Sequence, residues 1–171
     1  EAAALMMGWI GTKELAAHGI ALELVAISFM CHLGLSNAAT VRTGRYRGAG
    51  DRQGLRDGAL VAIALSAVFA AIIIAIFLAF PEPLIRIFLD MSKPEAAAIV
   101  AYGTSLLAMA ALFQLADAAQ VMALGFLRGV QDTRVPMILA SVSYWLIGFP
   151  VSYVLAFPLG LGGVGLWLGL V

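Results

Sequence analysis

The chain has 171 residues, of which 63% are hydrophobic and 12% are charged, and its mean hydropathy is +1.00. Soluble domains are typically about 45–50% apolar and about 25% charged, so this composition excludes an ordinary soluble protein and predicts a polytopic membrane protein. The net charge is zero, and the single cysteine is Cys31. We therefore expect no nucleic-acid partner, no disulfide framework and no multi-cysteine metal site.

The apolar segments predict an all-α transmembrane helix bundle with four complete spans and two shortened ones at its ends. The spans cover about residues 1–10, 15–40, 59–80, 96–127, 135–157 and 164–171. Each of the four middle spans is long enough to cross a hydrocarbon layer about 30 Å thick. The chain begins and ends inside apolar segments and has no basic leader. We therefore expect it to be an internal part of a longer protein.

The span 15–40 contains the acidic residue Glu23, five residues after His18. Glu23 is shallow enough to reach water and deep enough to line a cavity, so both readings stay open. We expect His18 to be a satisfied interfacial histidine. His32 and Cys31 are too isolated to suggest a metal site.

Two basic segments indicate which ends of the spans face the cytoplasm. Segment 41–58, predicted as a loop, holds five arginines and five glycines, and segment 128–134 begins and ends with arginine. The positive-inside rule places both segments in the cytoplasm. The connection between them on the other side, 84–95, has mixed charges and is predicted to be a short amphipathic piece on the membrane surface.

Asp117 is the only formally charged residue in the span 96–127. It precedes Arg128 by eleven residues, which places it roughly 16 Å from the charged end and near the middle of the membrane. A carboxylate at that depth costs about 2.5–3.5 kcal/mol or more, so it is a candidate functional group. Gln114 and Gln120 lie three residues to either side, on neighbouring positions of one helix face. The alternative is that Asp117 only links two helices through hydrogen bonds.

The span 135–157 contains a glycine and a proline near its middle, Gly148 and Pro150. Proline removes a backbone donor, so these residues should kink the helix. The kink is a candidate hinge for alternating access, and a static packing kink is the alternative.

Several short motifs, in order along nearly the whole chain, resemble one transporter family. They are Ala16-Ala-His18, Gly34-Leu-Ser-Asn-Ala-Ala-Thr-Val-Arg-Thr-Gly44, Asp117-Ala-Ala-Gln-Val121, Leu127-Arg-Gly-Val-Gln-Asp-Thr133, Ser143-Tyr-Trp145 and Gly148-Phe-Pro150. The sequence resembles the multidrug and toxic compound extrusion (MATE) transporters. The resemblance implies most of the C-terminal six-helix lobe of such a protein, with its first and last helices truncated and the N-terminal lobe missing.

The resemblance also implies site residues and an activity. Family members export drugs and organic cations in exchange for sodium ions or protons, and Asp117 matches the acidic residue used for cation coupling in this lobe. The family often has an aromatic residue one turn before this acid. Phe113 stands at that place, but it has no hydroxyl to ligate an ion. Glu23 stands where an amide is expected and adds a second acid. The implied protein lies in the plasma (inner) membrane, contacts lipids and needs no cofactor.

From these residues we expect an antiporter in which a proton or sodium ion and an organic cation compete for Asp117, with Gln114 and Gln120 as hydrogen-bonding neighbours. Asp117 would also be the contact for a sodium ion. One alternative is a lipid-linked oligosaccharide flippase of the same superfamily, although the spans lack the Arg and Lys that an anionic headgroup would favour. Another is a non-catalytic assembly subunit. We expect no enzyme, because the sequence has no His-Glu-x-x-His, no paired intramembrane aspartates and no nucleophile–base pair.

Overall fold

A computed structural model describes residues 2–92 and 94–170, and its described elements are all helical. The elements are α1 (Ala2–Ile10), α2 (Thr12–Gly48), α3 (Arg52–Ala79), α4 (Pro81–Arg86), α5 (Ala96–Gly129), α6 (Arg134–Ser141), the π-helix η1 (Val142–Gly148), α7 (Phe149–Ala156) and α8 (Gly162–Leu170). Four helical stretches are long and apolar enough to cross a membrane: α2, α3, α5 and the continuous run 134–156. The predicted all-α membrane bundle is confirmed. The predicted end spans include residues 1 and 171, which lie outside the described residues.

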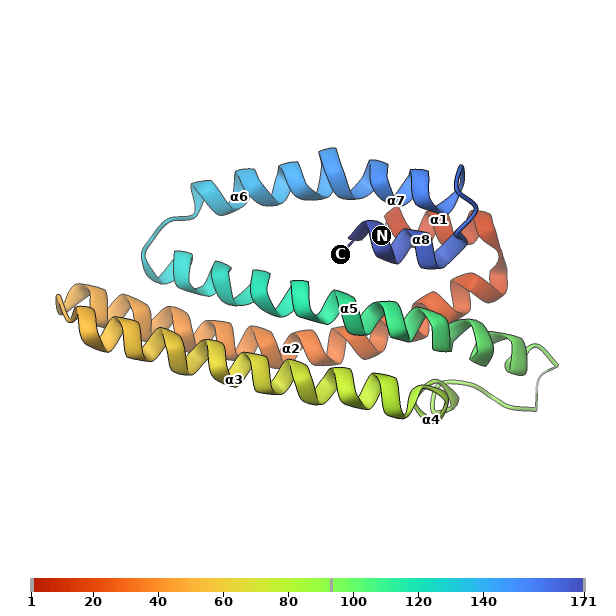
Figure 1. The fold of residues 1–171 in the computed structure, drawn as a ribbon, viewed down its shortest axis with the longest axis horizontal. Coiled ribbons are helices and arrows are strands. Elements are labelled where there is room, and N and C mark those ends of the chain that lie inside the picture. Colours follow the sequence, from red (N-terminus) through yellow and green to blue (C-terminus); the bar gives the residue numbers. More distant parts are fainter. Residues whose placement is uncertain (1, 93, 171) are drawn as a thin grey trace.

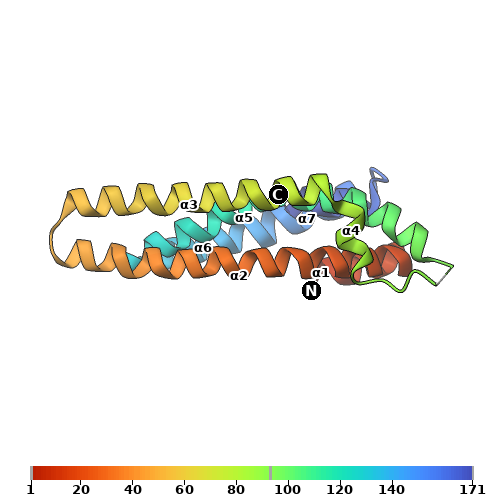
Figure 2. The same ribbon diagram turned by 90° about the horizontal axis from the view of Figure 1, so that it is seen from below.

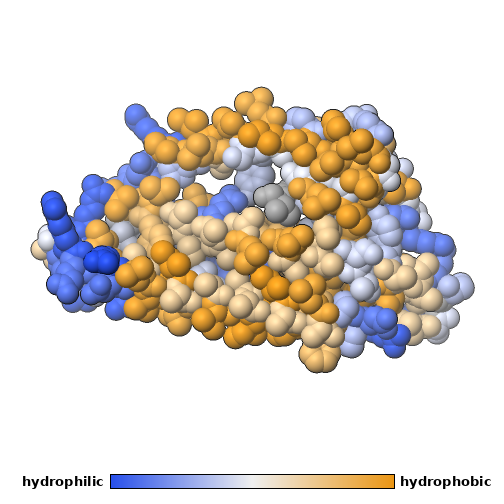
Figure 3. Space-filling view, viewed as in Figure 1, coloured by the Kyte–Doolittle hydropathy of each residue, from blue (hydrophilic) through white to orange (hydrophobic). Residues whose placement is uncertain are grey.

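The long helices α2, α3 and α5 lie side by side, and α6, η1 and α7 form an arm on the other side of α5 (Figures 1 and 2). The arm reaches the bundle mainly at one end, where α7 packs on α8 and α8 packs on α5. Large apolar side chains such as Ile72 on α3 and Trp145 on η1 are exposed. Figure 3 shows a broad apolar surface between hydrophilic ends, as expected for helices surrounded by lipid.

Small and hydroxyl-bearing residues hold α2 against α5. Ser36 Oγ donates to the Val121 carbonyl at 2.7 Å, and Thr40 Oγ1 donates to the Gly125 carbonyl at 2.8 Å. A Cβ atom on Gly125 would lie 2.7 Å from the Ser36 carbonyl oxygen, so the two backbones can approach this closely only because residue 125 is glycine. Close approach at small residues and interhelical hydrogen bonds are the usual means of helix packing in membranes.

The segment 41–58 is not the loop that the sequence predicted. Helix α2 continues to Gly48 and α3 begins at Arg52, so only residues 49–51 connect them. Arginine is a good helix former, and the segment contains no proline to stop either helix. Asp51 caps α3, since its side chain accepts a hydrogen bond from the Gly54 amide at 2.8 Å. The arginines thus lie on helix ends that extend beyond the apolar spans.

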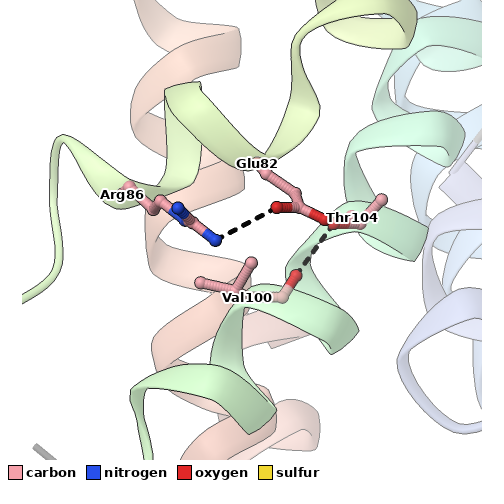
Figure 4. A network of polar contacts seen from close by, with 4 residues as sticks. All are labelled: Glu82, Arg86, Val100 and Thr104. Atoms are coloured by element: carbon pink, nitrogen blue, oxygen red, sulfur yellow. Dashed lines mark hydrogen bonds and ion pairs between the residues drawn. The ribbon is translucent and has the colours of Figure 1, made fainter. Parts of the chain in front are cut away.

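The predicted amphipathic piece at 84–95 is only partly helical, because α4 ends at Arg86 and residues 87–92 form turns. Within α4, Ile85 is buried and packs on Gly103 so closely that a Cβ atom added to Gly103 would lie 2.9 Å from the Ile85 side chain. Glu82 and Arg86 face outward and form an ion pair at 3.2 Å. Figure 4 shows this pair beside α5, where Thr104 donates to its own helix. The apolar side of α4 therefore docks on α5. Helix α5 then begins at Ala96.

Candidate functional site

Asp117 lies in the middle third of α5 and is 8% exposed. It borders a cavity of about 470 Å³ between α5 and the α6–η1 arm, which we call the main cavity. It also borders a side cavity of about 200 Å³ toward α2. Its Oδ2 atom is buried and has no hydrogen-bond partner within the described part of the chain. Figure 3 shows the hollow between the arm and α5, with hydrophilic surface inside it.

The two glutamines beside Asp117 face different neighbours. Gln114 is fully buried against α2, where its Oε1 accepts a hydrogen bond from Ser28 Oγ at 3.0 Å. Gln120 borders both cavities, and its Oε1 accepts a hydrogen bond from the Tyr144 hydroxyl at 2.9 Å. Gln114 and Gln120 are six residues apart, and each three-residue step falls about 60° short of a full helical turn. The two side chains therefore point about 120° apart. The predicted polar face is therefore split, and only Asp117 and Gln120 border the cavities.

Phe113 borders the main cavity one turn before Asp117. Its ring meets that of Trp167 edge-on, with centroids 5.8 Å apart. Trp167 in turn donates from Nε1 to His18 Nδ1 at 3.2 Å, and both side chains are buried. His18 therefore belongs to a buried aromatic cluster that joins α2, α5 and α8. This cluster supports the Phe113 end of the main cavity.

The arm that covers the main cavity changes its helical geometry opposite Asp117. Residues Val142–Gly148 form a π-helix, and the Phe149 amide bonds the Tyr144 carbonyl five residues earlier. Pro150, in the first turn of α7, lacks a backbone donor, and a proline ring clashes with the carbonyl four residues before it. A wider turn relieves that clash, and such π-bulges are frequent at functional sites. The irregularity predicted at Gly148 and Pro150 thus takes the form of a widened helix, whereas the hinge role stays a prediction.

Glu23 lies on α2 but is exposed, and it does not border either cavity around Asp117. The structure therefore separates it from the other predicted site residues. Among the described residues, no group of three or more His, Cys, Asp or Glu side chains could hold a metal ion. His32 instead bonds Ser66 of α3 at 3.2 Å through its Nδ1.

Sequence reasoning missed two residues of the site. Tyr144 reaches the site from the arm, and Ser28 donates a hydrogen bond to Gln114. After Thr12, the serines and threonines of α2 fall at positions 28, 36, 40 and 43, on one helix face. That spacing is the signal that could have identified the face of α2 that packs on α5. Tyr144 belongs to the motif Ser143-Tyr-Trp145, but that motif does not predict its contact with Gln120, which depends on the π-helical turn.

Comparison with known proteins agrees with this fold. A sequence profile of the family described as MatE matches residues 1–154, so the chain belongs to the MatE family. The chain is 49% identical over 169 residues to "Probable multidrug resistance protein NorM" of Rhizobium meliloti (strain 1021), covering 99% of this chain and 36% of the relative. It is 49% identical over 170 residues to the protein of the same description in Agrobacterium fabrum (strain C58 / ATCC 33970), covering 99% and 37%. The chain thus spans about a third of the length of these relatives.

Solved structures share the fold. The structure titled "Outward-facing conformation of a multidrug resistance MATE family transporter of the MOP superfamily" superposes with a TM-score of 0.83, at 21% identity, over 99% of this chain and 36% of that one. The corresponding inward-facing structure has a TM-score of 0.78, at 24% identity, and covers 99% of this chain and 38% of that one. Together with the four apolar helices, these similarities define the chain as an integral membrane protein with a MATE-type helix bundle.

Proposed function

We propose that this chain forms part of a secondary antiporter that exports drugs or organic cations in exchange for protons or sodium ions. The observation that carries the proposal is the carboxylate of Asp117, which is buried at mid-depth in α5, has no partner for Oδ2 among the described residues and borders the main cavity. A cavity of about 470 Å³ is within the range of small-molecule sites. The relatives' description as multidrug resistance proteins supports the substrate class.

The exchange follows from the cost of leaving a charge unpaired at this depth. A carboxylate inside a membrane must be neutralised, either by a proton or by a bound cation. Asp117 can hold one of these ligands at a time, so binding of an organic cation displaces the coupling ion, and the reverse. A ligand that binds one protein conformation better than the other then shifts the conformational equilibrium, which supplies the basis for alternating access.

The oxygen donors around Asp117 favour a proton over sodium as the coupling ion. Hard cations are normally surrounded by several oxygen ligands. Here the Gln120 oxygen accepts from Tyr144, the Gln114 oxygen accepts from Ser28, and Phe113 has no oxygen in its side chain. The Asp117 carboxylate offers a protonation site that needs no further ligand, whereas a sodium site would have to share oxygens, such as that of Gln120, that already accept hydrogen bonds.

The orientation and surroundings proposed for the chain follow from its charges and surface. The arginine-rich helix ends in 41–58 and the segment 128–134 lie at the same end of the bundle (Figure 1), and we assign that end to the cytoplasm. The membrane is the plasma (inner) membrane, the apolar surface contacts lipids, and an N-terminal lobe closes the transport path. The π-helical segment ending at Gly148, with Pro150 behind it, is the proposed flexible point.

The experiment that tests this function is replacement of the carboxylate in the full-length protein. Asp117→Asn keeps the size of the side chain and removes its charge. We expect export of a fluorescent organic cation to fall to background while membrane abundance is unchanged. Asp57→Asn, an exposed aspartate at the arginine-rich end, is the matched control and should transport normally. Normal export by Asp117→Asn would overturn the proposal, and loss of the protein from the membrane would instead support a role in helix assembly.

A further inference from the structure

We infer that the hydrogen bond between Tyr144 and Gln120 divides the space around Asp117 and thereby limits the size of the cation that the site accepts. This inference rests on the proposed function, because it takes Asp117 as the cation-binding group. It assigns to Tyr144 a specificity role that the sequence motifs did not predict.

The two cavities beside Asp117 meet at a small shared set of residues. The main cavity and the side cavity are both bordered by Asp117, Gln120, Leu124 and Tyr144. Among these four, a hydrogen bond joins Gln120 of α5 to Tyr144 of η1, at 2.9 Å. This hydrogen bond, which we call the bridge, therefore lies where the two cavities adjoin, one helical turn from the carboxylate. With the bridge closed, Asp117 faces two compartments of about 470 and 200 Å³ rather than one.

The bridge is built so that it can open. Within the described residues, it is the only hydrogen bond between α5 and the segment formed by α6 and η1. The arm is held to the bundle elsewhere, through the packing of α7 on α8. Gln120 is half-buried and Tyr144 is exposed, so water can replace either partner at little cost. Gln114 differs in each respect, because it is fully buried and bonds Ser28 within the α2–α5 contact.

A compact cation fits in one compartment and pairs with Asp117 while the bridge stays closed. A bulky cation needs space from both compartments, so it must break the bridge, and part of its binding free energy is spent on that opening. Removal of the Tyr144 hydroxyl abolishes this cost. One ordinary hydrogen bond corresponds to about a five-fold change in an equilibrium constant. The bridge should therefore weaken binding of bulky cations about five-fold relative to compact ones.

The test measures cation binding to the purified full-length protein, by competition against radiolabelled tetraphenylphosphonium. The competitors are tetraalkylammonium ions that increase in size from tetramethyl to tetrapentyl. We compare the wild type with two variants that break the bridge from opposite sides, Tyr144→Phe and Gln120→Met. Tyr153→Phe is the matched control, since Tyr153 is exposed on α7 and borders neither cavity.

In both bridge variants, the affinity ratio of the largest to the smallest ammonium ion should rise about five-fold, and the control should match the wild type. A merely structural role of Tyr144 would lower the affinity for all the ions together and leave the ratio unchanged. An unchanged ratio in both variants, with the wild type binding normally, overturns the inference but leaves the proposed function intact. If the wild type binds none of these cations, the proposed function fails and this inference fails with it.

Discussion

Substitution of Gly125 by alanine should separate α2 from α5 and destabilise the protein. The added Cβ atom would lie 2.7 Å from the Ser36 carbonyl oxygen, which is backbone and cannot rotate away. The helices must move apart, which strains the bonds from Ser36 to Val121 and from Thr40 to Gly125. Overpacking costs about 1–3 kcal/mol, and interhelical hydrogen bonds in membranes average about 0.6 kcal/mol each. We therefore expect a loss of about 2–4 kcal/mol in stability.

The assay is the thermal unfolding of the purified full-length protein in detergent, with membrane abundance measured in parallel. Gly34→Ala is the control, because a Cβ atom on Gly34 would meet no neighbouring atom within 4 Å. Alanine is favoured over glycine inside a helix by about 0.5–1 kcal/mol, so Gly34→Ala should have an equal or higher Tm. If Gly125→Ala unfolds at the same temperature as Gly34→Ala, the described α2–α5 contact is wrong.

Three further predictions concern the site and the orientation of the chain. Gln114→Ala should lower Tm, because it removes the hydrogen bond with Ser28 and leaves a cavity in the α2–α5 contact, but it should leave the Kd for tetraphenylphosphonium unchanged; a weaker Kd at an unchanged Tm would place Gln114 in the binding site. Pro150→Ala should maintain abundance and slow export, because it restores a backbone donor and stiffens the π-helical turn; export at the wild-type rate would make that turn a static packing feature. The topology is tested by cysteine labelling in a background in which Cys31 is replaced by serine. A membrane-impermeant maleimide should label Ser92→Cys from outside intact cells, and it should label Ala49→Cys only after lysis. The opposite pattern would invert the proposed topology.

The helices themselves were predictable from the sequence, because long apolar runs leave the backbone no alternative to internal hydrogen bonding in lipid. Their ends were less predictable. Glycines and charges in 41–58 suggested a loop, yet both flanking helices continue into this segment until only residues 49–51 connect them. Hydropathy indicates where a helix leaves the hydrocarbon layer, whereas the helix ends where its own caps and turn residues dictate.

The site was predictable only in part. Asp117 was evident from its charge in an apolar run, but spacing alone placed Gln114 and Gln120 on one face, and the structure turns them toward different helices. Glu23 was a candidate by depth, and it lies on the exposed side of α2. The contact of Tyr144 with Gln120 could not be predicted, because the π-helical turn that contains Tyr144 alters the register of the arm relative to α5. Periodicity assigns faces to a helix, and tertiary packing decides which partner each face meets.

The central claim is that an organic cation and the coupling ion compete for the Asp117 carboxylate. Its most direct test is proton release: tetraphenylphosphonium is added to the weakly buffered, purified full-length protein, and a pH-sensitive dye reports the change. If the coupling ion is a proton, cation binding should release protons from the wild type and from Asp57→Asn, and Asp117→Asn should lose this release. Proton release of the same size from Asp117→Asn, with the cation still bound, would contradict the claim.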